Sequence, residues 1–401
     1  MTAPPRSIVV VGGSIAALTA AETLRVHGHD GPIIMLSEEV HQPYSRVPLS
    51  KTVLAGVEPI ERALLPAPSD DIDFRPNSRA EALDVPGRRV RLQGGEQVGY
   101  DALVIATGAR ARRLAAPGVN GELVLRTLDD AGTLAHRLTS AGSVLVIGGG
   151  FLGMEIASTC RSLGKTVTVI DRDPPLARLL GPWLAGVLTA AACEHGIRIV
   201  HAPDGVSLLG ATRIDGVSYA DGTLAADVVI CAVGDQANIE WLHGSGLELS
   251  GGVVVDEHCQ AAPGVVAVGD VAVRRIGGVL QPRTPHWTNA VEQARAAART
   301  LLQPDARTGY RPDPYFWTEQ CGLDVKISGE LPLPGSPTIV DGSLAERTVL
   351  VQWHDDDGPV AAATINHRMP IVALKKLGHR ARSARSTAAA VHTSDPSPVL
   401  P

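Results

Sequence analysis

Hydrophobic residues in this chain form short continuous runs, and between these runs they recur every three or four positions. A run of four to six apolar residues is typical of a parallel strand buried on both faces, whereas the wider spacing predicts a helix with one buried face. The expected strands are Ile8–Val11, Ile33–Leu36, 103–106, 144–147, 167–170, 228–233 and 265–268. Helical spacing follows at 15–25 and Trp287–Leu302. This alternation predicts an α/β fold with parallel sheets.

The same pattern divides the chain into successive regions. Residues 1–112 alternate strand and helix patterns, residues 113–246 hold a second strand–turn–helix unit, and residues 247–318 return to the first region. From residue 319 to 380 the apolar runs are β-rich, which predicts a mixed C-terminal domain. Residues 381–401 combine Ser, Thr, Ala, His and Pro without periodicity, so we expect a disordered tail.

A glycine-containing turn follows the first strand. Gly12 supplies the tight turn, Ser14 stands where a second glycine allows close approach of a phosphate, and Ala17 replaces the third. A helix begins here, so backbone N–H groups can bind a pyrophosphate. Glu38 ends the next strand, where a carboxylate accepts the hydroxyls of an adenosine ribose. A plain strand–turn–helix corner is the alternative for a single fingerprint.

A second and more complete fingerprint follows the strand at 144–147. Gly148, Gly150 and Gly153 occupy all three glycine positions, and Asp171 ends the next strand. An acid at that position binds a free ribose 2′-hydroxyl and repels a 2′-phosphate, which favours NADH over NADPH. The neighbouring Arg172 could assist a phosphate instead. Two dinucleotide sites in one chain predict electron transfer between a nicotinamide and a flavin.

Composition narrows the possible functions. The 401 residues are 44% hydrophobic and 19% charged with a net charge of −6, values that give no reason to expect nucleic-acid binding. No apolar run reaches the length of a membrane span. Residues 1–6 leave no room for a signal peptide before the first strand, so we expect a cytoplasmic protein.

The five cysteines are scattered singly along the sequence. No two of them have the spacing of a redox-active pair or of zinc ligands, so we expect neither a redox disulfide nor a metal centre. The residues are Cys160, Cys193, Cys231, Cys259 and Cys321.

Several motifs occur in an order that resembles one family. They are PYSRVPLSK at 43–51, ATG at 106–108, GGGFLGME at 148–155, GD at 269–270, HWTNAVEQAR at 286–295 and PYFW at 314–317. Together they resemble the FAD-dependent ferredoxin reductases of bacterial oxygenase systems, over about residues 6–378. The resemblance implies a glutathione-reductase-like fold, with a discontinuous FAD domain, an inserted NADH domain and a C-terminal domain.

The resemblance also implies roles for individual residues. The expected FAD-binding residues are Gly12, Ser14, Ala16, Ala17, Glu38, Arg46, Lys51, Ala80, Thr107, Gly108, Arg126, Asp270 and Trp287. Among them, Arg126 would neutralise pyrophosphate charge, and the helix that begins near Trp287 would direct its N-terminus at the flavin. The expected NADH-binding residues are Gly148, Gly149, Gly150, Phe151, Leu152, Gly153, Asp171 and Gly234.

Three residues are implied to take part in electron transfer. Lys51 and Glu155 would meet beside the flavin, the ammonium stabilising charge on the reduced ring and the carboxylate fixing the lysine. A surface lysine and an ordinary helix glutamate are the structural alternative. Trp317 would lie at the flavin edge near the docking face, although an isolated tryptophan more often packs in a core.

The partner implied is an acidic [2Fe–2S] ferredoxin that serves a cytochrome P450 or a ring-hydroxylating oxygenase. Basic residues concentrate near the C-terminus and could attract it. They are Arg368, Lys375, Lys376, His379, Arg380, Arg382 and Arg385. The alternatives are a rubredoxin reductase, an NADH oxidase or diaphorase with small acceptors, and a redox-responsive binding protein resembling apoptosis-inducing factor.

Overall fold

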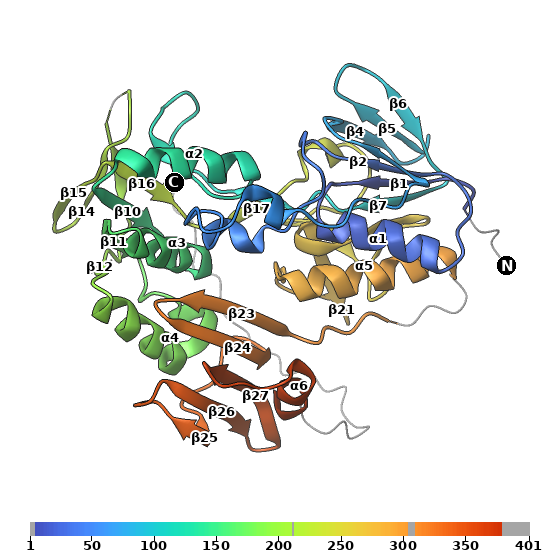
Figure 1. The fold of residues 1–401 in the computed structure, drawn as a ribbon. Coiled ribbons are helices and arrows are strands. Elements are labelled where there is room, and N and C mark those ends of the chain that lie inside the picture. The colour runs from blue at the N-terminus through green and yellow to red at the C-terminus, as the bar shows by residue number, and fades with distance from the viewer. Residues whose placement is uncertain (1–4, 211, 304–308, 379–401) are drawn as a thin grey trace, which may run out of the picture.

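Three layered units make up the molecule in the computed structural model, which describes residues 5–210, 212–303 and 309–378. Figure 1 shows two α/β units side by side, with a C-terminal sheet packed beneath the second of them. We call them the first unit, the second unit and the C-terminal unit. The expectation of an α/β fold with parallel sheets is confirmed.

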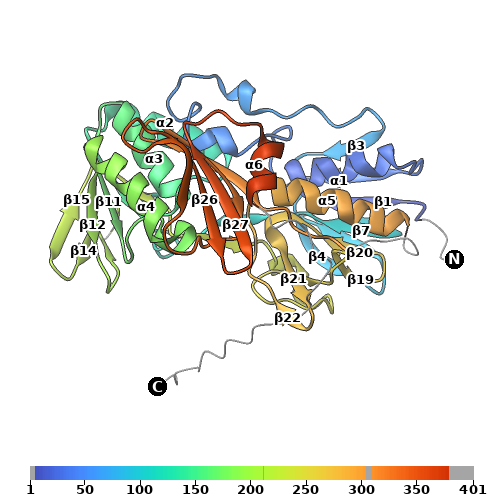
Figure 2. The ribbon, with the colours of Figure 1, turned by 90° about the horizontal axis from the view of Figure 1, so that it is seen from below.

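The first unit is built on a six-stranded sheet in the order β19-β20-β7-β1-β2-β3. Its strands are β1 (Ile8–Val11), β2 (Ile33–Leu36), β3 (Ile72–Arg75), β7 (Ala102–Ile105), β19 (Gln260–Ala262) and β20 (Val265–Ala267), all parallel except β19. Helices α1 (Ile15–Val26) and α5 (Trp287–Leu302) pack together against one face, as Figure 2 shows from below. The other face is covered by the antiparallel strands β4 (Ala80–Asp84), β5 (Arg89–Leu92) and β6 (Gln97–Gly99). Strands β7 and β20 are far apart in sequence, so residues before and after the second unit share one sheet.

The remaining elements of the first unit are short. They are the 3₁₀ turns η1 (Val47–Ser50), η2 (Ile60–Ala63), η3 (Glu240–Leu242) and η4 (Gly269–Val271), and the strands β18 (Val253–Val255), β21 (Ala272–Ile276) and β22 (Val279–Leu280). Residue Lys51 follows η1 directly, and Asp270 lies within η4.

The second unit repeats the parallel arrangement, with five strands in the order β12-β11-β10-β16-β9. They are β9 (Glu122–Leu123), β10 (Ser143–Ile147), β11 (Thr166–Asp171), β12 (Arg198–His201) and β16 (Val228–Cys231). Helices α2 (Leu128–Ser140), α3 (Phe151–Ser162) and α4 (Ala177–Glu194) contribute to its main core. The small sheet of β13 (Ser207–Leu209), β14 (Gly216–Tyr219) and β15 (Gly222–Ala225) forms a second cluster with the other face.

The C-terminal unit is an antiparallel sheet in the order β23-β24-β27-β26-β25. Its elements are β23 (Tyr315–Gln320), β24 (Leu323–Gly329), β25 (Thr338–Ser343), β26 (Thr348–Asp355), β27 (Gly358–Ile365) and α6 (Ile371–Gly378). Because β23 pairs with β24 along its whole length, the sheet starts before residue 319. The expected boundary after residue 318 falls within β23. The expected disordered tail at 381–401 lies outside the described residues.

The chain passes between the first and second units twice, through adjacent strands. Strand β8 (Ala109–Ala111) leads out, and β17 (Asp235–Ala237) leads back and pairs with it antiparallel. Figure 1 shows β17 between the two units. We call this pair the crossover ribbon.

The second and C-terminal units share one hydrophobic core. Buried residues of β10 and α4 belong to the same cluster as those of β24 and β26, together with Leu49 and Leu54 from the segment after β2. The rings of Trp183 on α4 and Trp353 on β26 meet edge to face at 5.9 Å. Helix α4 is interrupted at Gly181, whose φ is 73°; a Cβ there would lie 2.2 Å from the carbonyl oxygen of Leu333.

Candidate functional site

The turn after β1 has no room for a side chain and leads into a helix with a free N-terminus. Gly12 has φ +142°, and a Cβ would lie 2.2 Å from the carbonyl oxygen of Ala106. Helix α1 begins after Ser14, whose hydroxyl makes no capping hydrogen bond, and its first turn, which includes Ala16 and Ala17, holds no acid. The first N–H groups of the helix are therefore left for an external acceptor such as a phosphate.

The turn after β10 has the same construction. Gly148 has φ +105° and faces the carbonyl oxygen of Ala232, which would lie 2.4 Å from a Cβ. A Cβ on Gly153 would lie 1.9 Å from the carbonyl oxygen of Gly148, so only glycine lets α3 approach the turn this closely. Gly150 caps α3 without a side chain, and Phe151 and Leu152 open a first turn that holds no acid.

Helix α2 provides a comparison within the same chain. Thr127 accepts from the N–H of Asp130, and the Asp130 carboxylate accepts from the N–H of Thr127, so this N-terminus is satisfied internally. The ends of α1 and α3 carry neither arrangement. This difference fits two bound anions at those two helices, as two dinucleotides would supply.

Acidic residues end the second strand of both units. Asp171 lies at the end of β11 and accepts from the N–H of Gly149 at 2.5 Å and from that of Arg172 at 2.6 Å. Glu38 lies just beyond β2 with its side chain 62% exposed, 3.5 Å from Arg79. Asp171 therefore stands beside its glycine turn, and Glu38 follows Ser37, which lies against Gly13; these are the positions where a ribose would be bound.

Other predicted nucleotide residues lie around the two turns. Ala80 begins β4, next to Arg79. Thr107 and Gly108 lead into the crossover ribbon, where Thr107 donates its hydroxyl to the carbonyl of Asn238 and Asn238 donates its amide back. Gly234 has φ +100° and would have no atom within 4 Å of a Cβ, so its backbone faces open space.

Two predicted flavin residues from distant segments meet beside the first turn. Arg126 donates to the Asp270 carboxylate at 2.6 Å and to the carbonyl of Ala109 at 2.8 Å. Arg283 donates to the main-chain oxygen of Asp270 at 2.9 Å. A cation and an anion, both partly buried, are thereby held next to Gly108.

Arg46 makes hydrogen bonds to the main chain of Arg126 and to two nearby side chains. Its guanidinium donates to Glu39 at 2.7 Å, to the Tyr44 hydroxyl at 2.8 Å and to the main-chain oxygen of Arg126 at 2.5 Å. Burial raises the pKa of the Tyr44 hydroxyl, which stays protonated and donates to Glu39. The structure thus engages Arg46 with protein groups, among them the main chain of Arg126.

Lys51 and Glu155 meet between the first and second units. Lys51 Nζ lies 2.8 Å from Glu155 Oε2, with side chains only 14% and 10% exposed. The Ser50 hydroxyl also donates to Oε2 at 2.7 Å, and the Thr318 hydroxyl donates to Oε1 at 2.8 Å. Three units therefore converge on one carboxylate. The contact that the resemblance implies is present.

The N-terminus of α5 faces the same region. Trp287 is its first residue, and His286 precedes it without a side-chain capping bond. The His286 ring stacks on Phe316 at 5.1 Å, and Phe316 meets Phe151 edge to face at 5.7 Å. Burial lowers the pKa of His286, which favours the neutral ring.

Trp317 is not brought to this meeting point. Its ring lies 5.9 Å from that of Tyr315 and packs against the buried cluster that Tyr315 forms with Leu350, Ala362 and Leu374 of α6. Its neighbour Thr318 points to the other face of β23 and reaches Glu155. The role of Trp317 stays a prediction. The sequence analysis did not single out Thr318. Residues two apart in a strand share a face, so Thr318 and Phe316 could have been placed on the same face of β23.

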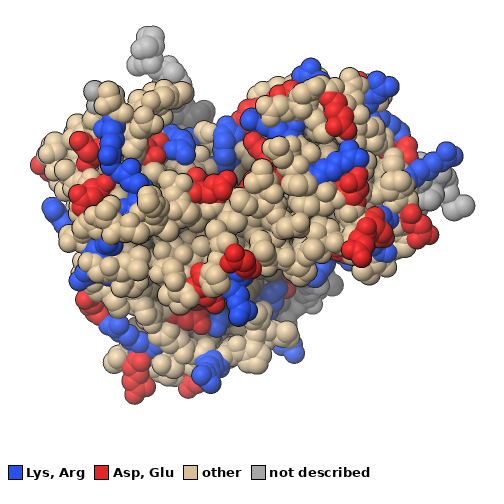
Figure 3. All heavy atoms as spheres, turned by 45° about the horizontal axis from the view of Figure 1, so that its top comes forward, with Lys and Arg blue, Asp and Glu red and all other residues tan. Residues whose placement is uncertain are grey.

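The predicted basic docking patch is smaller than its sequence suggests. Lys375 binds Asp313 at 2.7 Å and Glu292 at 3.5 Å, so including it among free docking cations was wrong. Arg368 and Lys376 are exposed. His379, Arg380, Arg382 and Arg385 lie outside the described residues. Figure 3 shows acidic and basic side chains interspersed over one face of the molecule.

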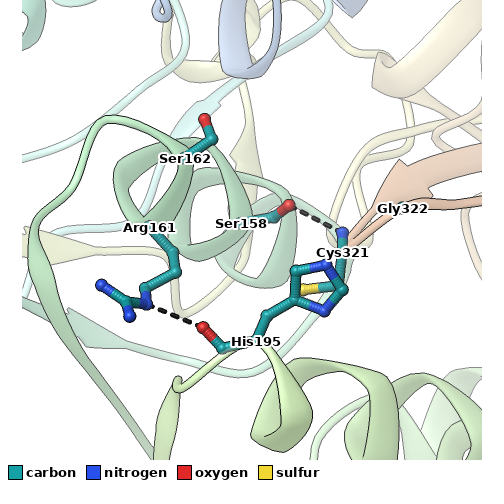
Figure 4. A pocket seen from close by; sticks show the side chains of 6 residues that line it. All are labelled: Ser158, Arg161, Ser162, His195, Cys321 and Gly322. Atoms are coloured by element: carbon teal, nitrogen blue, oxygen red, sulfur yellow. Dashed lines mark hydrogen bonds between the residues drawn. The ribbon is translucent and has the colours of Figure 1, made fainter.

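A separate cavity of about 370 Å³ lies away from this chemistry, between α3 and the turn after β23 (Figure 4). On its wall, Arg161 donates to the main-chain carbonyl of His195, and the Ser158 hydroxyl accepts from the N–H of Cys321. Their contacts are those of structural residues. Within the described ranges, no helix is long and apolar enough to cross a membrane, and no cluster of side chains could hold a metal ion.

Comparisons with known proteins agree with this geometry. Residues 6–294 match the family model described as pyridine nucleotide-disulphide oxidoreductase. The biphenyl dioxygenase system ferredoxin–NAD(+) reductase component of Paraburkholderia xenovorans is 34% identical, covering 89% of each chain. Rhodocoxin reductase of Rhodococcus erythropolis is 36% identical, covering 80% of this chain and 78% of the relative.

A solved structure extends the likeness to the fold. The crystal structure of a covalent putidaredoxin reductase–putidaredoxin complex matches with a TM-score of 0.82 and 29% identity, covering 92% of this chain and 91% of that chain. The match spans the first, second and C-terminal units together.

Proposed function

Because this chain belongs to the pyridine nucleotide-disulphide oxidoreductase family, we propose that it is a FAD-dependent NADH:ferredoxin reductase. The observation that carries the proposal is the buried Lys51–Glu155 pair, which joins the first unit to α3 of the second. The pair joins two units that each carry a glycine-containing turn and a helix that begins without a side-chain cap.

We assign FAD to the first unit and NADH to the second. The free N-terminus of α1, the Arg126 cation, Asp270 and Glu38 are the groups that would hold FAD. The free N-terminus of α3 and Asp171 would hold NADH. The FAD, when bound, supplies the chemistry that converts hydride transfer into single-electron transfer.

The protein's contribution is orientation and charge. Lys51 presents an ammonium fixed by Glu155, and Ser50 and Thr318 donate to the same carboxylate. The N-terminal end of α5 adds a positive dipole on the first-unit side. Both features favour negative charge between the two units.

The proposed electron acceptor is an acidic [2Fe–2S] ferredoxin that in turn serves a cytochrome P450 or a ring-hydroxylating oxygenase. Support comes from relatives named for such partners and from the exposed cations Arg368 and Lys376. A rubredoxin or a small-molecule acceptor is the alternative. All five cysteines are free thiols, which fits a cytoplasmic location.

The test is reduction of cytochrome c by NADH with and without an added [2Fe–2S] ferredoxin. We expect the purified protein to release FAD on acid treatment and to reduce cytochrome c rapidly only when the ferredoxin is present. Rapid reduction with rubredoxin alone would support the alternative acceptor, and release of FMN would contradict the assignment of the first unit.

A further inference from the structure

Glu155 is held by a side chain from the C-terminal unit as well as by Lys51. The hydroxyl of Thr318 on β23 donates to Oε1 at 2.8 Å, while Lys51 and Ser50 occupy Oε2. Thr318 is fully buried and Ser50 is 2% exposed, so water cannot substitute freely for either donor. The C-terminal unit thus binds Oε1 of the carboxylate, and the first unit binds Oε2.

The direction of the Thr318 hydroxyl is fixed by its neighbour. Gln320 Nε2 donates to Thr318 Oγ1 at 3.1 Å, and Gln320 is itself 3% exposed. An amide can only donate through its nitrogen, so the Thr318 oxygen is used as an acceptor there and its proton is directed to Glu155. The result is a one-way chain from Gln320 through Thr318 to the carboxylate.

Strand β23 lies along one face of α3, which keeps this chain in place. Phe316 meets Phe151, Thr318 meets Glu155, and the N–H of Cys321 donates to Ser158 Oγ at 2.7 Å. The helix positions 151, 155 and 158 are spaced by four and three, so they share one face. Contacts on both sides of Thr318 therefore fix its position along the helix.

We propose that Thr318 is a positioning residue for the Lys51–Glu155 pair, holding Oε1 so that Oε2 stays directed at the ammonium. The inference rests on the proposed function, because it concerns the same pair. Without the hydroxyl, the buried Glu155 carboxylate loses one of its three donors. Its orientation relative to Lys51 and Ser50 can then change. The C-terminal unit would then contribute to nicotinamide–flavin transfer without contacting either group.

The test compares Thr318→Val, which keeps the shape and removes the hydroxyl, with Thr318→Ser, which restores the hydroxyl. We expect Thr318→Val to slow the saturating rate of flavin reduction by NADH about tenfold, since one hydrogen bond to a charged group is lost. The NADH dissociation constant should stay within twofold, and the flavin midpoint potential should shift. Thr318→Ser should reduce within twofold of the unmodified protein.

Two controls separate positioning from general packing. Thr364→Val changes a buried threonine of β27 in the same sheet and should leave the rate unchanged. In a Glu155→Ala background, Thr318→Val should slow reduction less than twofold further, because its acceptor is gone. A wild-type rate for Thr318→Val, or a full tenfold loss in the Glu155→Ala background, would overturn the proposal.

A second variant covers the case in which Thr318→Val does not fold. Gln320→Met removes only the amide that orients the hydroxyl, and we expect a loss of about threefold in the same rate, with the melting temperature of the FAD-bound protein recorded alongside. An unchanged rate in a folded Gln320→Met protein would contradict the one-way chain. If NADH does not reduce the unmodified protein at all, the proposed function fails instead.

Discussion

At the scale of single residues, the Lys51–Glu155 pair depends on the small number of donors that bind the Glu155 carboxylate. One ammonium and two hydroxyls satisfy its carboxylate, and its side chain is 10% exposed. A buried charge that loses a partner costs more than a surface charge, because solvent cannot replace the missing interaction. Changes at this site should therefore have large effects.

Replacing Lys51 with Met keeps most of the side-chain stem and removes the ammonium. Flavin reduction by NADH should slow at least tenfold, since a charged hydrogen bond is worth about 1.5–3 kcal/mol, and the flavin midpoint potential should fall. Stopped-flow spectroscopy under anaerobic conditions measures the rate. Lys376→Met, at an exposed position, is the control. If a fully flavinated Lys51→Met protein is reduced by NADH at the rate of the unmodified protein, Lys51 has only a structural role.

The carboxylate of Asp171 should set the coenzyme preference. It accepts from three N–H groups at the end of β11, where a ribose hydroxyl fits and a phosphate dianion is repelled. NADH should exceed NADPH in kcat/KM by roughly thirtyfold, about 2 kcal/mol. Asp171→Ala should narrow the ratio, whereas Asp173→Ala should not, because Asp173 pairs with Arg178. Equal efficiencies in the unmodified enzyme would mean that Arg172 dominates.

At the scale of elements, the helix N-termini divide into two kinds. Helix α2 satisfies its own first turn with Thr127 and Asp130, whereas α1 and α3 begin without side-chain caps at glycine-containing turns. An internally capped end contributes stability, and an open end can bind an anion. The chain thus keeps binding capacity at α1 and α3, and α5 likewise begins without a side-chain cap.

Gly153→Ala tests the turn before α3. The added Cβ would lie 1.9 Å from the carbonyl oxygen of Gly148, which is backbone and cannot rotate away. We expect the helix to shift and NADH affinity to fall at least tenfold, about 1.4 kcal/mol, with FAD retained. Gly186→Ala in α4, where a Cβ meets no atom within 4 Å, is the matched control. Titration of NADH against the oxidised flavoprotein measures the affinity, and unchanged binding would refute the steric argument.

Elements were predictable where the pattern is local. Strands β1 and β2 and helix α5 have the bounds expected from their apolar runs, because each pattern lies within one short segment. The start of β23 was missed because residues 314–317 were assigned as a motif preceding the C-terminal domain, although aromatic residues favour strands. Lys375 was misjudged because Asp313 and Glu292 lie far away in sequence. The contact between Thr318 and Glu155 could not be predicted, because it depends on how β23 packs against α3.

At the scale of the whole molecule, the three units are unequally joined. The second and C-terminal units share a continuous core that includes Trp183 and Trp353, whereas the two main clusters of the first unit comprise residues of that unit. Loss of packing in the shared core should therefore weaken two units together.

Trp353→Ala removes a side chain that is 1% exposed in this core. Truncation of a buried tryptophan typically costs about 3–5 kcal/mol, so the urea transition followed by circular dichroism should move to lower concentration. Release of FAD, followed by its fluorescence, should shift less. Trp241→Ala, which lies in a core cluster of the first unit, should show the opposite order. Equal shifts of both signals in each variant would indicate one cooperative unit.

The crossover ribbon has a consequence for how such a protein could arise. Ala111 pairs with Asp235 and Ala109 with Ala237, so the segment between them leaves and re-enters the first unit at neighbouring positions. A segment with adjacent ends can be inserted into a host by one genetic event without separating the strands of the host sheet. Exchange of residues 112–234 between homologous genes should yield folded chimaeras, provided that the transplanted α3 and α4 still match the C-terminal sheet.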